Sequence, residues 1–181
     1  HSIDVDGPVL PTFPIIENRN WVSETRETSN IVKSYDIHDF AHSSSELYDE
    51  LSSHISAYHV AYYNEPAPVK AYRRKSVDIY SIWANIQGPN EWQPRHIHTK
   101  GVSFIVYVDK PDTNDFPHSG DIQFYYGEYQ NYSQNIFFYK PEDGDILIFP
   151  HWCQHQIIPF TSDVRRVSVA GNAIITSENL E

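Results

Sequence analysis

The chain has 181 residues, 40% of them hydrophobic and 14% aromatic, which is enough for one domain with a packed core. Its formal net charge of -11 argues against an electrostatic hold on nucleic acid or on an anionic membrane surface. A single cysteine, Cys153, permits no internal disulfide, and no apolar run approaches a membrane span, so we expect a cytoplasmic protein without a membrane segment.

The N-terminal part of the chain, residues 1–76, is predicted to be an accessory region that packs on a core formed by residues 77–181. Residues 9–16 combine β-prone side chains with prolines, which favours an edge strand. Residues 43–46 then offer capping side chains for a helix predicted over residues 45–63. Apolar residues recur at helical spacing along it and are expected to rest on a sheet: Leu47, Leu51 and Ile55.

The rest of the chain consists of short β-prone segments separated by turn residues such as those at 110–112, 119–120 and 141–144. Seven or eight short strands at this spacing predict a mainly β protein, either a sandwich or a small barrel. The predicted strands cover residues 79–86, 104–108, 121–126, 136–139, 145–149, 167–170 and 173–175.

Two histidines follow a turn-like stretch and precede an apolar run. In an extended backbone, side chains two residues apart project to the same side, so His96 and His98 can reach one point while Ile97 turns away. Neutral imidazole is a common ligand of first-row transition metals, which favours a metal site here. The alternative is two unrelated surface residues in a chain with ten histidines.

A third histidine follows the apolar strand that ends at Pro150. The chain makes a short excursion there, and His155 returns at the start of the next extended stretch. Alone, a histidine at this place would be a structural hydrogen-bonding residue, but paired with the upstream histidines it completes a three-ligand site. His151 competes for the same role, and the pattern favours His155.

An arginine begins the next predicted strand. Alternation places Val167 and Val169 on one face and Arg166, Ser168 and Ala170 on the other. An arginine among small residues on the face opposite the valines can lie inside a barrel only if it holds an anion. The sequence therefore predicts an anion site near the histidines.

These features together resemble the iron and co-substrate pattern of the 2-oxoglutarate/Fe(II)-dependent oxygenases. More narrowly, they resemble a branch of that superfamily known mostly from bacteria and marine phages. The likeness covers about residues 79–173, half of the chain, and leaves the first 75 residues unmatched. It rests on residues 83–86, 96–98, 103–107, 144–152 and 166–172.

The resemblance implies a double-stranded β-helix, a jelly-roll or cupin-like barrel, with a helical N-terminal extension and iron at its open end. The general family has Asp or Glu at the position of His98, whereas histidine often stands there in the branch. The branch usually has a small residue at Phe104. The implied ligands of Fe(II), which are also the implied catalytic residues, are His96, His98 and His155. The implied 2-oxoglutarate contacts are Arg166 and Ser168, with Asn85 and Tyr107 near the cofactor.

The implied activity is that of a dioxygenase that uses O2 and 2-oxoglutarate to hydroxylate an unidentified small-molecule or peptide substrate, with release of succinate and CO2. Two alternatives stay open. A cupin-type metal-dependent dioxygenase or isomerase fits residues 145–155, but the glutamate of the first cupin motif is missing from residues 99–102. A non-catalytic ligand-binding β-barrel is the other, with the tyrosine-rich residues 125–132 as a contact surface.

Overall fold

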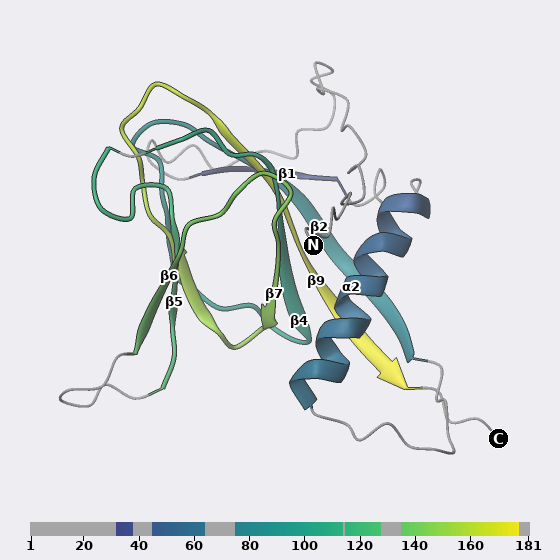
Figure 1. Cartoon of the computed structure of the whole chain (residues 1–181). Coiled ribbons are helices and arrows are strands. Elements are labelled where there is room, and N and C mark those ends of the chain that lie inside the picture. The colour runs from purple at the N-terminus through teal and green to yellow at the C-terminus, as the bar shows by residue number, and fades with distance from the viewer. Residues whose placement is uncertain (1–31, 38–44, 64–74, 114, 128–134, 178–181) are drawn as a thin grey trace, which may run out of the picture.

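A computed structural model describes residues 32–37, 45–63, 75–113, 115–127 and 135–177 (Figure 1). The predicted edge strand at residues 9–16 and most of the tyrosine-rich segment lie outside these described residues. Among the described residues, no helix is both long and apolar enough to cross a membrane.

The described strands form two antiparallel sheets that face each other (Figure 1). The five-stranded sheet has the order β1 (Lys33–Asp36), β2 (Lys75–Gln87), β9 (Arg166–Ser177), β4 (Val102–Asp109) and β7 (Ile146–Pro150). The four-stranded sheet has the order β3 (Gln93–His96), β8 (Gln154–Ile157), β5 (Ile122–Tyr125) and β6 (Ile136–Tyr139). The chain passes back and forth between the sheets, which confirms the predicted double-stranded β-helix.

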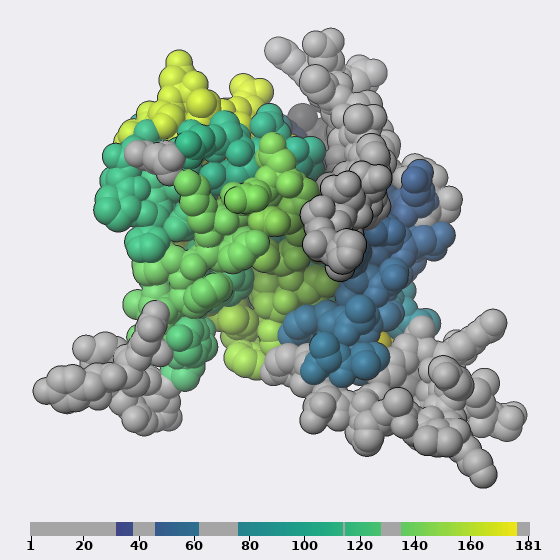
Figure 2. Space-filling model, viewed as in Figure 1, coloured from purple at the N-terminus to yellow at the C-terminus, as the bar shows by residue number. Residues whose placement is uncertain are grey.

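The predicted helix is confirmed as α2 (Ser45–Tyr63), which lies against one side of the barrel (Figure 2). Its apolar residues are buried against the outer face of the five-stranded sheet, where they join a core cluster with Ile79, Ile82, Phe104 and Val169. The Tyr48 hydroxyl also donates to the Val77 carbonyl oxygen at 2.8 Å. The helix therefore backs the sheet, as its spacing indicates.

A second core cluster contains Ile105, Tyr107, Ile122, Phe149, Ile157 and Ala170. Strand β9 contributes Val169 to the outer cluster and Ala170 to this one, as the alternation in the sequence predicts. The first half of β9 thus has one face toward the helix and the other toward the second cluster.

Two strand predictions need correction. The segments 167–170 and 173–175 are parts of one strand, β9, which continues through Gly171. A glycine inside a strand often marks a break, but a Cβ at Gly171 would lie 2.4 Å from Phe104 Cζ, so this glycine makes room for the aromatic ring of the neighbouring strand. Strands β1 and β3 were not predicted, because their sequences carry no alternating apolar pattern and their pairing partners lie far along the chain.

We expect Phe104→Ala to lower the free energy of unfolding by about 3 to 5 kcal/mol, because the Phe104 side chain is fully buried in the outer cluster and its loss leaves a cavity. Urea unfolding would measure the change. Phe104 offers no ligand atom, so the folded variant should still bind a divalent metal. A loss below about 1 kcal/mol would show that the ring contributes little to the outer cluster.

Candidate metal centre

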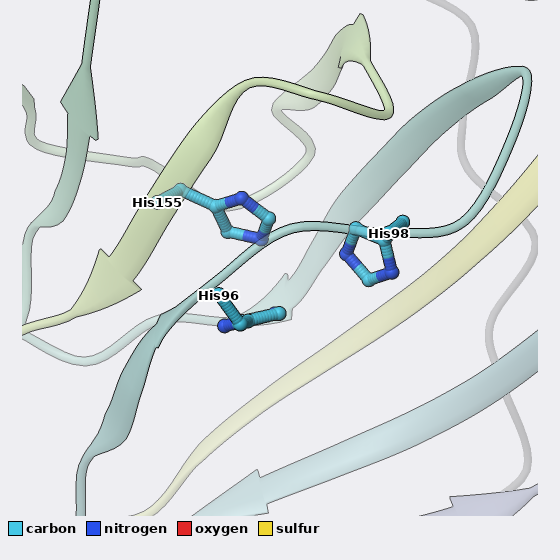
Figure 3. Close-up of side chains that lie close together, drawn as sticks. All are labelled: His96, His98 and His155. Carbon is cyan, nitrogen blue, oxygen red and sulfur yellow. The ribbon is translucent and has the colours of Figure 1, made fainter.

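The three predicted histidines come together between β3 and β8. His96 is the last residue of β3 and lies directly opposite His155 of β8, while His98 follows two residues after β3. One ring nitrogen from each histidine lies within 4.8 Å of the others. The ring centroids are 4.3 Å apart for His96 and His155 and 5.2 Å apart for the other two pairs (Figure 3).

Backbone hydrogen bonds hold the loop that carries His98. The His98 amide donates to the His151 carbonyl oxygen at 2.9 Å, and the His151 amide donates to the Gly101 carbonyl oxygen at 3.1 Å. Gly101 has a φ of 75°, and a Cβ there would lie 2.0 Å from the Ala173 carbonyl oxygen, so only glycine fits. The ligand loop is thus fixed to the β7–β8 turn and to β9.

Hydrogen bonds also define the tautomers of two histidines. The Nδ1 atom of His96 lies 2.7 Å from the Pro94 carbonyl oxygen, and that of His155 lies 2.9 Å from the Cys153 carbonyl oxygen. A carbonyl oxygen only accepts, so Nδ1 carries the hydrogen in both rings. Both Nε2 atoms therefore offer lone pairs, as metal-binding histidines do.

Burial keeps His98 and His155 neutral. It lowers the pKa of His155 to about 3, with the neighbouring charges of His96 and His98 adding to the effect. Burial also lowers the pKa of His98 to about 4, assisted by His96 and His151. Rings that are neutral at pH 7 bind a metal ion without first releasing protons.

His151, the competing candidate, lies outside the cluster. Its Nδ1 contacts the Gly101 carbonyl oxygen at 2.9 Å, so it supports the loop that carries His98.

The predicted co-substrate residues lie beside the histidines. Arg166, Ser168 and Asn85 line the same cavity as the three histidines. Ser168 of β9 lies between Asn85 of β2 and Tyr107 of β4, its direct partners in the sheet, so these side chains form a row across the sheet. Asn85 Oδ1 accepts a 2.6 Å hydrogen bond from the Ser34 hydroxyl of β1, which fixes one end of the row.

Arg166 is a buried cation. Its side chain is 3% exposed, and its Nη1 donates to the Gly120 carbonyl oxygen at 2.6 Å. In the described part of the chain, no carboxylate lies within ion-pairing distance of it. Burial lowers the pKa of Arg166, while Tyr107 and Asp121 raise it. A buried arginine of this kind is suited to hold an anion.

Tyr107 lies beside Arg166 in the second core cluster and is not part of the described cavity lining. Its ring centroid lies 5.8 Å from the guanidinium carbon of Arg166. Burial raises the pKa of Tyr107 to about 12, so its hydroxyl is neutral and able to donate. This hydroxyl is buried and has no hydrogen-bond partner among the described residues. An unpartnered donor next to an unpaired cation fits a carboxylate.

Two further cavity residues were missed by the sequence analysis. Gln87 lies opposite Arg166 in the sheet, and its Oε1 is buried without a partner among the described residues. The Trp83 ring lies 5.9 Å from that of His98. Both line the cavity. The signal was present, because Trp83, Asn85 and Gln87 alternate on one face of a predicted strand.

An open groove of about 500 Å³ adjoins the cavity. Phe149 lines both, and its ring lies 4.7 Å from that of His155. The described lining of the groove is uncharged: Tyr58, Phe124, Ile146, Leu147, Ile148, Phe149 and Cys153. Phe149 is thus shared by the cavity that His155 lines and by the uncharged groove.

Comparison with protein families matches residues 81–172, just over half of the chain, to the family described as "Putative 2OG-Fe(II) oxygenase". No curated protein matches the chain.

Solved structures with the same fold include a Pseudomonas putida prolyl-4-hydroxylase, which is 13% identical with a TM-score of 0.50. The match covers 82% of this chain and 74% of the hydroxylase chain. The non-heme α-ketoglutarate-dependent carbocyclase SnoK from nogalamycin biosynthesis is 14% identical with a TM-score of 0.52. The match covers 83% of this chain and 68% of the SnoK chain. An oxidoreductase of the 2OG-Fe(II) oxygenase family from Burkholderia pseudomallei is 10% identical, with a TM-score of 0.45 over 56% of this chain. The chain spans 46% of the length of that oxidoreductase.

The metal-free protein should lose stability as the pH falls below about 6.5, because the unfolded chain then binds protons on His98 and His155 that the folded chain does not. Their folded pKa values, about 4 and about 3, lie below the unfolded value of 6.5. The stability contributed by these two histidines is therefore fully present above pH 6.5 and is lost as the pH falls toward their folded pKa values. For His155 alone the slope is roughly 1.4 kcal/mol per pH unit.

Urea unfolding at about pH 7 and about pH 5 would measure this loss. The His155→Gln variant should show a smaller loss than the unsubstituted chain. Equal losses in the two proteins would mean that His155 does not titrate as its burial indicates.

Single replacement of His96, His98 or His155 by alanine should weaken Fe(II) binding by more than about 100-fold, since loss of a ligand exceeds the loss of an outer-shell contact. Anaerobic titration would measure the affinity. His54→Ala is the matched control, because it removes an exposed imidazole of α2 that lies outside the cluster. If the three ligand variants bind Fe(II) as tightly as the control variant, the ligand assignment is wrong.

Proposed function

Because the chain belongs to the 2OG-Fe(II) oxygenase family, whose cofactors are Fe(II) and 2-oxoglutarate, we propose that it hydroxylates a small-molecule or peptide substrate. The observation that carries this proposal is one cavity that contains both a cluster of three histidines and a buried arginine with no carboxylate partner in the described part of the chain. A cytoplasmic location and the division of the chain near residue 76 remain predictions.

The donor set of the cavity suits both cofactors. His96, His98 and His155 would hold Fe(II) through neutral imidazole nitrogens, a ligand type that iron accepts. Arg166 would hold the distal carboxylate of 2-oxoglutarate. Ser168 would donate a further hydrogen bond to it, while the Tyr107 hydroxyl and Asn85 border the same region. This division of roles is supported by the register of β9 against β2 and β4.

His98 changes the charge of the centre. A carboxylate ligand at this position would leave bound Fe(II) with a net charge near +1, whereas three neutral imidazoles leave about +2. The higher charge should strengthen the binding of dianionic 2-oxoglutarate. The low pKa of His98, about 4, keeps the ring neutral and supports this account.

When bound, Fe(II) and 2-oxoglutarate supply the oxidising chemistry, in which O2 converts 2-oxoglutarate to succinate and CO2 and one oxygen atom enters the substrate. The protein binds and orients the two cofactors and excludes water from them. Apolar side chains complete the cavity lining around the histidines, which limits the access of water to them. These residues are Val32, Phe104, Ile105, Phe149, Ile157 and Ala170.

Hydroxylation is proposed over other oxidations because the described cavity lining offers few acid–base groups. Its titratable side chains are His96, His98, His155 and Arg166. Three of these would be occupied by the metal and the fourth by a carboxylate. Insertion of an oxygen atom needs no further proton donor or acceptor from the protein, which supports the simplest outcome.

The test is anaerobic titration with Fe(II) and then 2-oxoglutarate, following the weak visible charge-transfer band that forms when a 2-oxo acid chelates iron. We expect a band that requires both additions. Arg166→Gln should weaken 2-oxoglutarate binding by about 10-fold or more, because a charged hydrogen bond to the carboxylate is lost, while Fe(II) affinity stays the same.

Tight Fe(II) binding without a band would contradict the proposal and favour a metal-dependent barrel of another kind. Equal loss of both affinities in Arg166→Gln would indicate misfolding, and circular dichroism of the variant would separate that case from a change confined to the site.

A further inference from the structure

The Gly120 carbonyl oxygen, which accepts from Arg166, lies in a turn that only glycine fits. Gly120 has a φ of 73°, and a Cβ there would lie 2.3 Å from the Thr113 hydroxyl oxygen. The Thr113 hydroxyl donates to the Ser119 carbonyl oxygen at 2.9 Å, and the Gly120 amide donates to the Pro159 carbonyl oxygen at 3.2 Å. The carbonyl that holds Arg166 therefore has a defined position.

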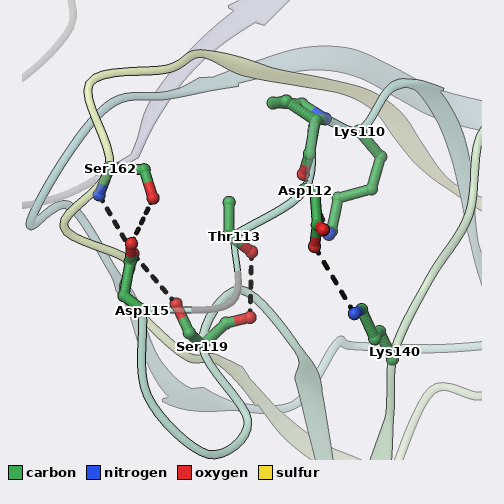
Figure 4. Close-up of polar contacts among 8 residues, drawn as sticks. Lys110, Asp112, Thr113, Asp115, Ser119, Lys140 and Ser162 are labelled. Carbon is green, nitrogen blue, oxygen red and sulfur yellow. Dashed lines mark hydrogen bonds and ion pairs between the residues drawn. The ribbon is translucent and has the colours of Figure 1, made fainter.

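An exposed carboxylate joins this turn to the segment that leads into β9. Asp115 accepts hydrogen bonds from the Thr161 amide at 2.6 Å and from the Ser162 amide at 3.0 Å. The hydroxyls of Ser162 and Ser119 also donate to it, the latter at 3.2 Å (Figure 4). These hydrogen bonds hold the pKa of Asp115 well below its usual range, so the carboxylate is charged.

The two segments that Asp115 joins carry the acceptor and lead to the donor of one hydrogen bond, from Arg166 to the Gly120 carbonyl oxygen. The β4–β5 loop, residues 110–121 without residue 114, carries Gly120, whose carbonyl oxygen accepts from Arg166. Residues 158–165 lead into β9, which begins at Arg166 itself. Any shift between these segments would change the separation of the Arg166 backbone from the acceptor of its side chain.

We infer that Asp115 is a positioning residue for Arg166, and that it presets the guanidinium to receive the distal carboxylate of a 2-oxo dicarboxylic acid. The inference rests on the proposed function. Asp115 itself is outside the cavity lining and acts through the turn at Gly120 and through the start of β9.

The test compares two metal-chelating 2-oxo acids, 2-oxoglutarate and pyruvate, on the metal-loaded protein under anaerobic conditions. Pyruvate lacks the distal carboxylate, so its affinity is independent of Arg166. Asp115→Ala should weaken 2-oxoglutarate binding by about 10-fold, in line with the loss of an outer-shell partner, and leave the affinities for pyruvate and Fe(II) unchanged.

The matched control is Asp112→Ala, which removes an exposed carboxylate from the same loop that pairs with Lys140 at 3.5 Å (Figure 4). It should leave the preference for 2-oxoglutarate over pyruvate unchanged. Ser162→Ala removes one hydroxyl donor to Asp115 and should reduce the preference by less than Asp115→Ala. This milder variant keeps the test decisive if Asp115→Ala does not fold.

The outcomes separate this inference from the proposed function. If the unsubstituted protein does not prefer 2-oxoglutarate to pyruvate, the proposed function fails. If it does, and Arg166→Gln abolishes the preference while Asp115→Ala and Ser162→Ala retain it, only the positioning role is overturned. Parallel loss of both 2-oxo acids and of Fe(II) in both variants would also overturn it, since that result reflects general damage.

Discussion

The pairing of β3 with β8 is the constraint on which the candidate centre depends. It places His96 directly opposite His155, although the two residues lie far apart in the chain. His98 then needs only two more residues of a loop that hydrogen-bonds to the β7–β8 turn. The three histidines come from β3, the loop after it and β8, and the larger sheet contributes Asn85 of β2 and Arg166 and Ser168 of β9 to the same cavity.

The interior of the barrel combines costs that only a ligand would offset. Arg166 is buried without a carboxylate partner in the described chain, and the Tyr107 hydroxyl is buried without a hydrogen bond there. Each such group costs free energy, typically about 1 to 3 kcal/mol for an unsatisfied polar group. His98 and His155 avoid the larger cost of buried charge because their lowered pKa values keep them neutral. Apolar burial elsewhere in the fold must offset these costs, and the outer cluster under α2 contributes to it.

The sequence predicted what depends on local alternation and missed what depends on distant partners. Period-two spacing gave the two faces of β9 and brought His96 and His98 to one side, and both features are present in the structure. Strand β3 contains Pro94 and little apolar character, so only its partner β8 defines it. Asp115 resembled any exposed loop carboxylate, because its four donors come from residues whose proximity exists only in the folded chain.

Phe104 belongs both to the outer cluster and to the lining of the cavity. The resemblance found in the sequence implies a small residue at this position. The large ring packs opposite Gly171 of β9, and a side chain at residue 171 would collide with it. The bulk missing from one strand is thus supplied by its neighbour. Its sequence neighbour Ile105 belongs to the second cluster, with Tyr107 and Ala170. Because side chains alternate along β4, Phe104 fills the space beside Gly171 on the side that faces the helix. Tyr107 lies on the other side of β4, beside Arg166.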